Sequence, residues 1–285
     1  MTRVGPAVAL VSGALVWSGC EEAPDAPRSA PLTCSGAVAG GEVVFGYQQL
    51  PSLRVALDAA ILGENGTTYF FVDDACDYWI YRRDDGSPAG PWAEPRTGRL
   101  DDAELAVLNT EILVQPWSSL AGVVAGDGDG GTVVAWYRSD VAACVGFGCR
   151  ADRPDFDRVR GAAETLLDRL YADGTPVREG PMRVDVMPYE GPADAYPFVA
   201  WSGSISLTEL ERSPDEIVSA GGRPALDPAD ADAVRAIAAP FVRGDHGSFY
   251  YHALPVSEGG RLFHLYAREV VPHEDERGLI RAPAE

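Results

Sequence analysis

Apolar and polar residues alternate along much of the chain, and this pattern predicts a protein built mainly from β-strands. Three early segments combine the alternation with valine and aromatic residues, namely EVVFGY, TTYFFV and DYWIYR between residues 42 and 82. Residues 53–61 fit either a strand or one face of a helix, and we favour the strand. Asn65-Gly66 follows this segment, and Asn-Gly between apolar runs is typical of a β-hairpin. We therefore expect an antiparallel sheet here.

A glycine-rich stretch at 127–131 separates two more apolar segments, 120–126 and 132–138. We interpret this stretch as the turn of a second hairpin. Its two aspartates resemble the start of a calcium loop, but an EF-hand needs a glutamate at the twelfth position, where this chain has Arg138. A hairpin turn is therefore expected at this place, and a calcium site is not.

Apolar residues at helical spacing predict two main helices. The first begins at Asp101, where Glu104 completes a capping box, and it ends at Pro116. The second covers residues 152–171, with its apolar side chains on one face, and Gly174 ends it. Shorter helices are expected over 207–212 and 227–239, strands over 182–187 and 198–201, and a final hairpin of 248–254 and 261–271 around the turn 257–260.

Strands joined by hairpins outnumber the helices in this prediction. The expected fold class is therefore α+β, with one or more mainly antiparallel sheets and a few packed helices. A chain of 285 residues is long enough for two lobes with their own cores. We place an N-terminal lobe at 34–150 and a C-terminal lobe at 151–285, or a single domain that spans both ranges.

The N-terminus carries a pattern typical of export. An apolar run over residues 7–17 is too short to span a bilayer, and the small residues Ser18 and Gly19 then lead directly to Cys20. This arrangement resembles the leader of bacterial lipoproteins, in which small residues precede a cysteine that receives a lipid before cleavage. The resemblance implies that residues 1–19 are a signal peptide and that Cys20 becomes the lipid-bearing first residue.

The segment after Cys20 looks like a spacer. Residues 20–33 mix acidic residues with three prolines, which favours a disordered, extended tether. Fatty acyl chains such as palmitate on Cys20 would hold the protein on a bilayer surface. The resemblance to lipoproteins therefore implies attachment to a membrane of the cell envelope, and of the possible membranes we favour the outer one.

Four cysteines remain beyond Cys20, and an even number in an oxidising compartment favours two disulfides. Three pairings are possible. We prefer Cys34 with Cys76 and Cys144 with Cys149, because the spacing CVGFGC can close a short loop while the other bond ties down the start of the domain. The cysteines lack CxxC spacing, which argues against a zinc site.

Charge and composition exclude several classes of function. The chain has 43 acidic and 23 basic residues, a formal net charge of -20, which would repel nucleic acid phosphates. All 23 basic residues are arginine. Without lysine there is no P-loop lysine, no Ser-Lys hydrolase and no lysine Schiff base. Nucleic acid is therefore not an expected partner.

Catalytic and metal-binding motifs are not recognisable in the sequence. The four histidines fall in the last forty residues without the HExxH spacing of zinc enzymes. They are His246, His252, His264 and His273. Ser202 and Ser204 lie in a turn-like context without a GxSxG elbow. We therefore predict no catalytic residue, no bound metal and no cofactor.

Nine aromatic residues are able to line a carbohydrate or peptide cleft, although aromatics in alternating strands more often divide between the core and the opposite face of a sheet. They are Tyr78, Trp79, Tyr81, Trp92, Trp117, Trp136, Phe249, Tyr250 and Tyr251. The leading interpretation is a lipid-anchored, non-enzymatic binding or structural module with a protein or glycan partner in the envelope. The alternative is a periplasmic or surface hydrolase whose histidine and carboxylate groups come from distant segments.

Overall fold

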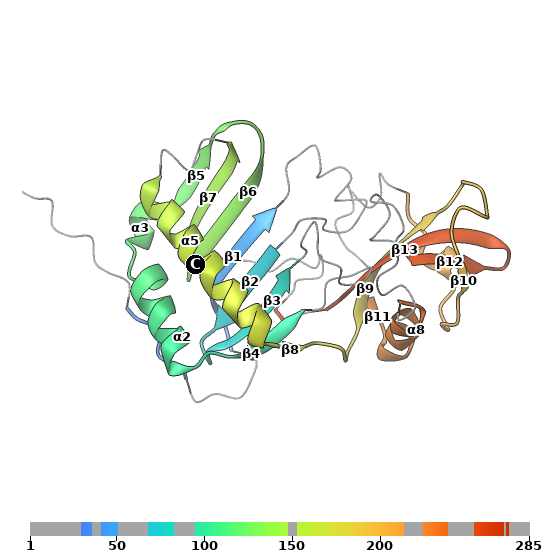
Figure 1. Cartoon of the computed structure of the whole chain (residues 1–285), viewed down its shortest axis with the longest axis horizontal. Helices are drawn as coiled ribbons and strands as arrows, with labels where there is room; N and C mark the ends of the chain where they lie inside the picture. Colours follow the sequence, from blue (N-terminus) through green and yellow to red (C-terminus); the bar gives the residue numbers. More distant parts are fainter. Residues whose placement is uncertain are drawn as a thin grey trace, which may run out of the picture.

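The structure is a computed structural model that describes residues 30–35, 41–50, 68–82, 95–147, 153–213, 225–238, 254–270 and 272–273. These residues form two sheets with helices packed beside them (Figure 1). All but two of the strand pairings between named strands are antiparallel, the exceptions being β5 with β7 and β10 with β12. The predicted α+β class with mainly antiparallel sheets is confirmed.

The first sheet has eight strands in the order β5-β7-β6-β1-β2-β3-β4-β8. Their bounds are β1 Val43–Leu50, β2 Thr68–Asp73, β3 Asp77–Arg82, β4 Arg96–Arg99, β5 Gly122–Ala125, β6 Asp127–Tyr137, β7 Asp140–Phe147 and β8 Thr175–Pro176. Strands β1, β2 and β3 match the three early segments that alternation predicts. The segment 53–61 and the turn Asn65-Gly66 lie outside the described residues.

The second predicted hairpin is wrong in its pairing. Strand β5 pairs in parallel with β7, whereas β6 pairs antiparallel with β7 and with β1. The glycine-rich stretch 127–131 belongs to β6, and the ladder to β7 shifts register between Asp127 and Thr132. The tight turn comes later, at Arg138 and Ser139, and Arg138 has a left-handed φ of 55°. The glycines of 127–131 were interpreted as a hairpin turn that would join two neighbouring strands. In the structure β7 lies between β5 and β6, so these two strands are not paired with each other.

Helices α2 Asp102–Val107, η1 Leu108–Leu113, α3 Trp117–Leu120 and α5 Pro154–Asp173 accompany the first sheet. The predicted capping box is confirmed: the Glu104 N–H donates to Asp101 Oδ1 at 2.7 Å, and the Asp101 N–H donates to Glu104 Oε2 at 2.8 Å. Helix α5 begins with proline in its first turn and has Gly174 as its C-cap residue, as predicted. Local end signals therefore located both helices correctly.

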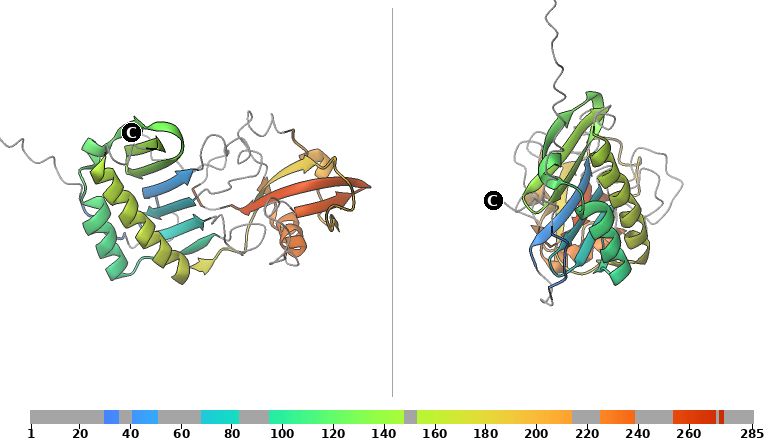
Figure 2. Two further views of the ribbon diagram at one scale, coloured as in Figure 1. Left: turned by 45° about the horizontal axis from the view of Figure 1, so that its top comes forward. Right: turned by 90° about the vertical axis from the view of Figure 1, so that its left-hand side faces the viewer.

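One hydrophobic core joins these helices to one face of the first sheet. Strand residues of this core include Phe45, Phe70 and Ile80, and helix residues include Trp117, Phe156 and Leu170. Figure 2 shows the helices together on that face of the sheet from two further directions. We call the first sheet with α2, η1, α3 and α5 the first lobe.

The change from one core to the next comes later than the expected boundary at residue 150. Helix α5, which that boundary assigns to the C-terminal lobe, supplies six buried apolar residues, and all six belong to the core of the first lobe. Strand β8 extends the same sheet by pairing with β4. The passage to the second sheet therefore falls between Pro176 and Met182, because a helix belongs with the sheet that buries its apolar face.

The second sheet has the strand order β10-β12-β13-β9-β11. Its elements are β9 Met182–Pro188, β10 Val199–Ala200, β11 Ala225–Leu226, β12 Leu254–Glu258 and β13 Arg261–Glu269, with helices α6 Leu207–Leu210 and α8 Pro228–Ala238. We call this group the second lobe, and it has its own hydrophobic core. The final hairpin is confirmed for its described part, where Gly259 and Gly260 form the turn with φ values of 57° and 83°.

Among the described residues, no helix is both long enough and apolar enough to cross a bilayer.

Candidate functional site

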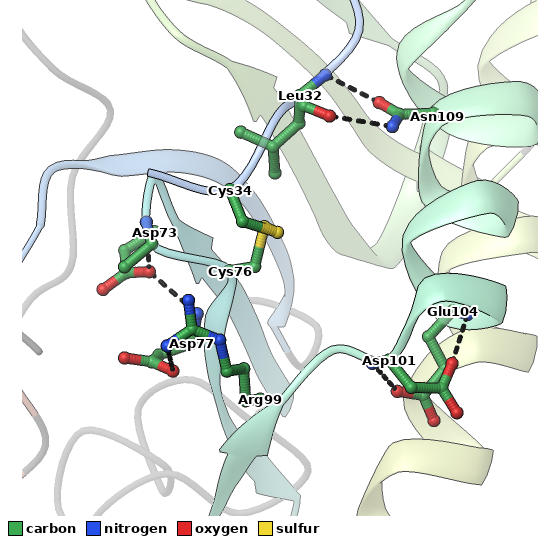
Figure 3. Close-up of a disulfide and its surroundings, with 10 residues drawn as sticks. Leu32, Cys34, Asp73, Cys76, Asp77, Arg99, Asp101, Glu104 and Asn109 are labelled. Atoms are coloured by element: carbon green, nitrogen blue, oxygen red, sulfur yellow. Dashed lines mark hydrogen bonds and ion pairs between the residues drawn. A yellow bond between two sulfur atoms is a disulfide. The ribbon is translucent and has the colours of Figure 1, made fainter. Parts of the chain in front are cut away.

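The structure contains the Cys34–Cys76 disulfide, as the preferred pairing predicts (Figure 3). The two Cα atoms are 5.2 Å apart, and the bond joins the segment 30–35 to the β2–β3 turn. Cys144 is also held in a disulfide. Its predicted partner Cys149, like the predicted lipidation site Cys20, lies outside the described residues, so that pairing stays a prediction.

The end of the predicted tether is part of the folded first lobe. Leu32 is buried, its N–H donates to Asn109 Oδ1 at 2.7 Å, and Asn109 Nδ2 donates back to the Leu32 carbonyl at 3.0 Å (Figure 3). The Tyr137 hydroxyl donates to the carbonyl of Ala30 at 2.6 Å. Residues 30–33 are therefore not spacer, and a tether starting at Cys20 ends before Ala30.

The β2–β3 turn beside the disulfide holds a buried carboxylate. Asp73 Oδ1 accepts the N–H of Ala75 at 3.0 Å and the N–H of Asp77 at 2.9 Å, which fixes the turn. Asp73 Oδ2 has no hydrogen-bond partner among the described residues and is closed off from solvent. Burial raises the pKa of Asp73, while these backbone bonds and the proximity of His273 act in the opposite direction.

His273 meets the first sheet on the face opposite its helices. Its ring lies edge-on to Phe71 at 6.0 Å and to Trp79 at 5.5 Å between centroids. The backbone at His273 has a left-handed φ of 68°, and its Nε2 is buried without a hydrogen-bond partner among the described residues. A histidine and a carboxylate from distant segments thus come near one another here, but their unpaired atoms are shielded from solvent.

A second group of rings lies in the second lobe and is partly exposed. We call Tyr189, Tyr196, Phe198 and His264 the aromatic surface. Tyr189 follows β9, Tyr196 and Phe198 belong to the loop that leads to β10, and His264 is in β13. None of the four belongs to the buried core of its lobe.

The four rings contact one another closely. Tyr189 lies 4.9 Å from His264 and 5.2 Å from Phe198, measured between ring centroids. Tyr196 stands nearly perpendicular to Tyr189, Phe198 and His264 at 5.5 to 6.0 Å. Gly191 allows this packing, because a Cβ there would come within 2.2 Å of the Tyr189 hydroxyl. The rings therefore form a preassembled unit, and each of its four residues is partly exposed.

His264 is a neutral group at pH 7. Burial lowers its pKa from the ordinary value of 6.5, so the imidazole carries little charge at neutral pH. The titratable side chains around it are the phenols of Tyr189, Tyr196 and Tyr266. Its cross-strand neighbours, Met187 on β9 and Pro255 on β12, carry no charge. The aromatic surface thus offers ring faces, hydroxyls and a neutral imidazole.

The other residues singled out in the sequence have structural surroundings or lie outside the described residues. Ser204 Oγ donates to Asp230 Oδ2 at 3.0 Å, and the Ser204 N–H donates to Oδ1 of the same carboxylate at 2.5 Å, so Asp230 fixes this turn. His246 and His252 fall outside the described ranges. Across the described ranges, no three histidine, cysteine or acidic side chains are grouped to hold a metal ion.

The aromatics that sequence patterns suggested for a cleft are buried wherever they are described. Tyr78, Trp79, Tyr81, Trp117 and Trp136 all lie inside the first lobe. Trp92 and residues 249–251 lie outside the described ranges. Sequence reasoning missed Tyr189, Tyr196 and Phe198. The signal was three aromatics in a loop that follows Pro188 and contains prolines at 192 and 197. Comparisons with known proteins find no matching family model, no matching curated protein and no matching solved structure.

Proposed function

We propose that this protein is a lipoprotein of the bacterial cell envelope, attached to a membrane, with the outer membrane favoured, by a lipid on Cys20. The support is the leader pattern of residues 1–20 together with the Cys34–Cys76 disulfide, since such bonds persist in oxidising compartments. The short interval between Cys20 and the folded segment at Ala30 would keep the first lobe near the bilayer surface.

Replacing Cys20 with serine tests the anchor. The full chain expressed in a bacterium that processes lipoproteins should carry fatty acids on its amino-terminal peptide and fractionate with membranes, because acyl chains bury in the bilayer. The Cys20→Ser chain should lose both properties, as measured by mass spectrometry of that peptide and by membrane fractionation. A wild-type chain that keeps residues 1–19, or that lacks fatty acids on Cys20, would refute the proposal.

The anchored part acts as a non-enzymatic module that binds a protein or glycan partner. One observation carries this conclusion: the aromatic surface is a rigid group of rings, partly exposed and separate from the core of the second lobe. Ring faces with polar tips are typical of interfaces, because they supply apolar contact area and hydrogen bonds together. A hydrolase is not proposed, since the free polar atoms of Asp73 and His273 are closed to solvent.

Site-specific photocrosslinking in intact envelopes tests this binding role. A photoreactive residue at exposed Ala195, beside Tyr196, should form a defined crosslinked product, whereas the same residue at exposed Thr110 in the first lobe should not. Combining the Ala195 probe with Phe198→Ser should reduce the product about tenfold, because an interface loses most of its affinity with a central ring. The same yield from both probes, or a yield unaffected by Phe198→Ser, would contradict the assignment.

A further inference from the structure

We propose that the aromatic surface receives a positively charged side chain, foremost an arginine, presented by a partner protein. This inference rests on the proposed binding role and narrows it to one class of ligand. Three features support it: the acidic residues of the loop, the close spacing of the rings, and the burial or pairing of the nearby arginines.

The loop that carries three of the four rings is acidic. Residues 184–211, which include this loop, most of β9 and all of β10, contain no arginine, and the protein contains no lysine. Glu190 directly follows Tyr189, Asp194 precedes Tyr196 by two residues, and both carboxylates belong to exposed residues. A surface of this kind attracts cationic groups and repels anionic ones.

The arginines at the two ends of this stretch do not supply a competing cation. Arg183 and Arg212 are in the second lobe near β9; Arg183 is buried, and Arg212 lies 3.5 Å from the buried carboxylate of Asp185. His264 is neutral at pH 7 because burial lowers its pKa. Arg261, at the start of β13, is paired with Glu211 at 2.7 Å and lies over the Phe263 ring. The loop residues next to the rings are therefore acidic, and the nearby arginines are already paired or buried.

The spacing of the rings selects the kind of cation. Centroid distances of 4.9 to 6.0 Å mean that the rings touch, so an ammonium group does not fit between them as it would in an open cage. A cation must instead lie against an outward ring face. A planar guanidinium stacks on such a face and still donates hydrogen bonds at its edge to carboxylates, here those of Glu190 and Asp194, which favours arginine over lysine.

The test uses the mature chain and the peptide acetyl-Gly-Arg-Gly-Arg-Gly-amide, with the same peptide carrying citrulline as the uncharged isostere. Calorimetry should show the arginine peptide binding about twofold to fivefold more tightly than the citrulline peptide, the range expected for exposed cation–π contacts. In amide NMR spectra the arginine peptide should shift the signals of Tyr189, Tyr196 and Phe198.

Two pairs of variants with the same change in net charge distinguish the effect of the carboxylates beside the rings from the effect of the overall negative charge of the protein. The pair Glu190→Gln and Asp194→Asn should weaken the arginine peptide about threefold to tenfold, as the loss of two nearby carboxylates implies. Removing two exposed carboxylates of the first lobe, with Asp102→Asn and Glu111→Gln, changes the net charge equally and should leave affinity nearly unchanged. Equal effects of the two pairs would overturn the inference.

Titration of His264 provides a second readout. A bound cation beside the imidazole disfavours its protonation, so the arginine peptide should lower the pKa of His264 further, as read from its ring proton signals. By linkage, affinity should fall as the pH drops through that pKa, because protonated His264 repels the cation. The titratable side chains that face His264 are the phenols of Tyr189, Tyr196 and Tyr266.

The outcomes distinguish the inference from the function on which it rests. If the citrulline peptide or chitotetraose, a neutral glycan, shifts the same ring residues as strongly, the aromatic surface binds ligands but the cationic assignment is wrong. If the Ala195 crosslink fails in envelopes and neither peptide nor glycan perturbs these residues, both proposals are wrong. Specific shifts with the arginine peptide alone, lost in Glu190→Gln/Asp194→Asn, support the inference.

Discussion

Serine at both Cys34 and Cys76 will lower the free energy of unfolding of the first lobe by about 4 kcal/mol, because the bond closes a loop of sequence separation 42 in the unfolded chain. The bond also keeps the segment with buried Leu32 beside the sheet. Urea unfolding followed by tryptophan fluorescence measures the loss, since Trp79, Trp117 and Trp136 are all buried in this lobe.

Single variants provide the control for the disulfide. Cys34→Ser and Cys76→Ser should each lower the free energy of unfolding as much as the double variant does, because either substitution removes the same bond. Asn109→Ala leaves the bond intact but removes the two hydrogen bonds to Leu32, and it should cost about 1–2 kcal/mol. Substitution is preferable to reduction, since reduction also breaks the bond at Cys144. A double variant whose free energy of unfolding falls by less than that of Asn109→Ala would contradict the explanation by loop closure.

Methionine in place of Arg235 will lower the free energy of unfolding of the second lobe by about 3–5 kcal/mol, the usual cost of removing one member of a buried ion pair. Arg235 on α8 holds the β13 residue Glu269 with two bonds of 2.9 and 2.6 Å, and it also donates to the Gly180 carbonyl. The carboxylate of Glu269 is only 3% exposed and the Arg235 side chain 17%. Unfolding of the second lobe is followed by the indole NMR signal of Trp201, because that ring packs on its core and fluorescence would also report the buried tryptophans of the first lobe.

Two further variants show whether the cost arises from burial. Asp232 also pairs with Arg235, but its side chain is 75% exposed, so Asp232→Asn should cost at most about 0.5 kcal/mol. Arg235→Met combined with Glu269→Leu should regain most of the lost stability, because no unpaired charge then remains in the interior. The interpretation fails if Asp232→Asn lowers the free energy of unfolding as much as Arg235→Met, since the cost would then not depend on burial.

Local signals in the sequence were sufficient for the helices and for several strands. The capping box of Asp101 and Glu104 and the glycine after α5 act within a few residues of the helix ends, so a sequence pattern contains all their partners. Strands β9 and β13 were likewise predicted by alternation. The expected boundary at residue 150 missed the packing of α5, because nothing in its amphipathic face indicates which sheet covers it.

The pairing between strands could not be predicted from the sequence. Residues 120–126 and 132–138 have the composition of neighbouring strands, yet β7 lies between β5 and β6. The choice depends on long-range burial and register, which no short window of sequence contains. The aromatic surface was missed for the same reason, since Tyr189 and His264 meet only after β9 and β13 have paired.

By itself, the sequence determined the α+β class, the ends of the main helices and the residues able to form the Cys34–Cys76 bond, because these depend on patterning, caps and the chemistry of individual side chains. Only the tertiary structure decided which sheet each element joins, which aromatics are buried, and that three rings from the loop between β9 and β10 share one partly exposed surface with His264 of β13. Those outcomes follow from contacts between distant segments, whose free energies are set when the cores assemble.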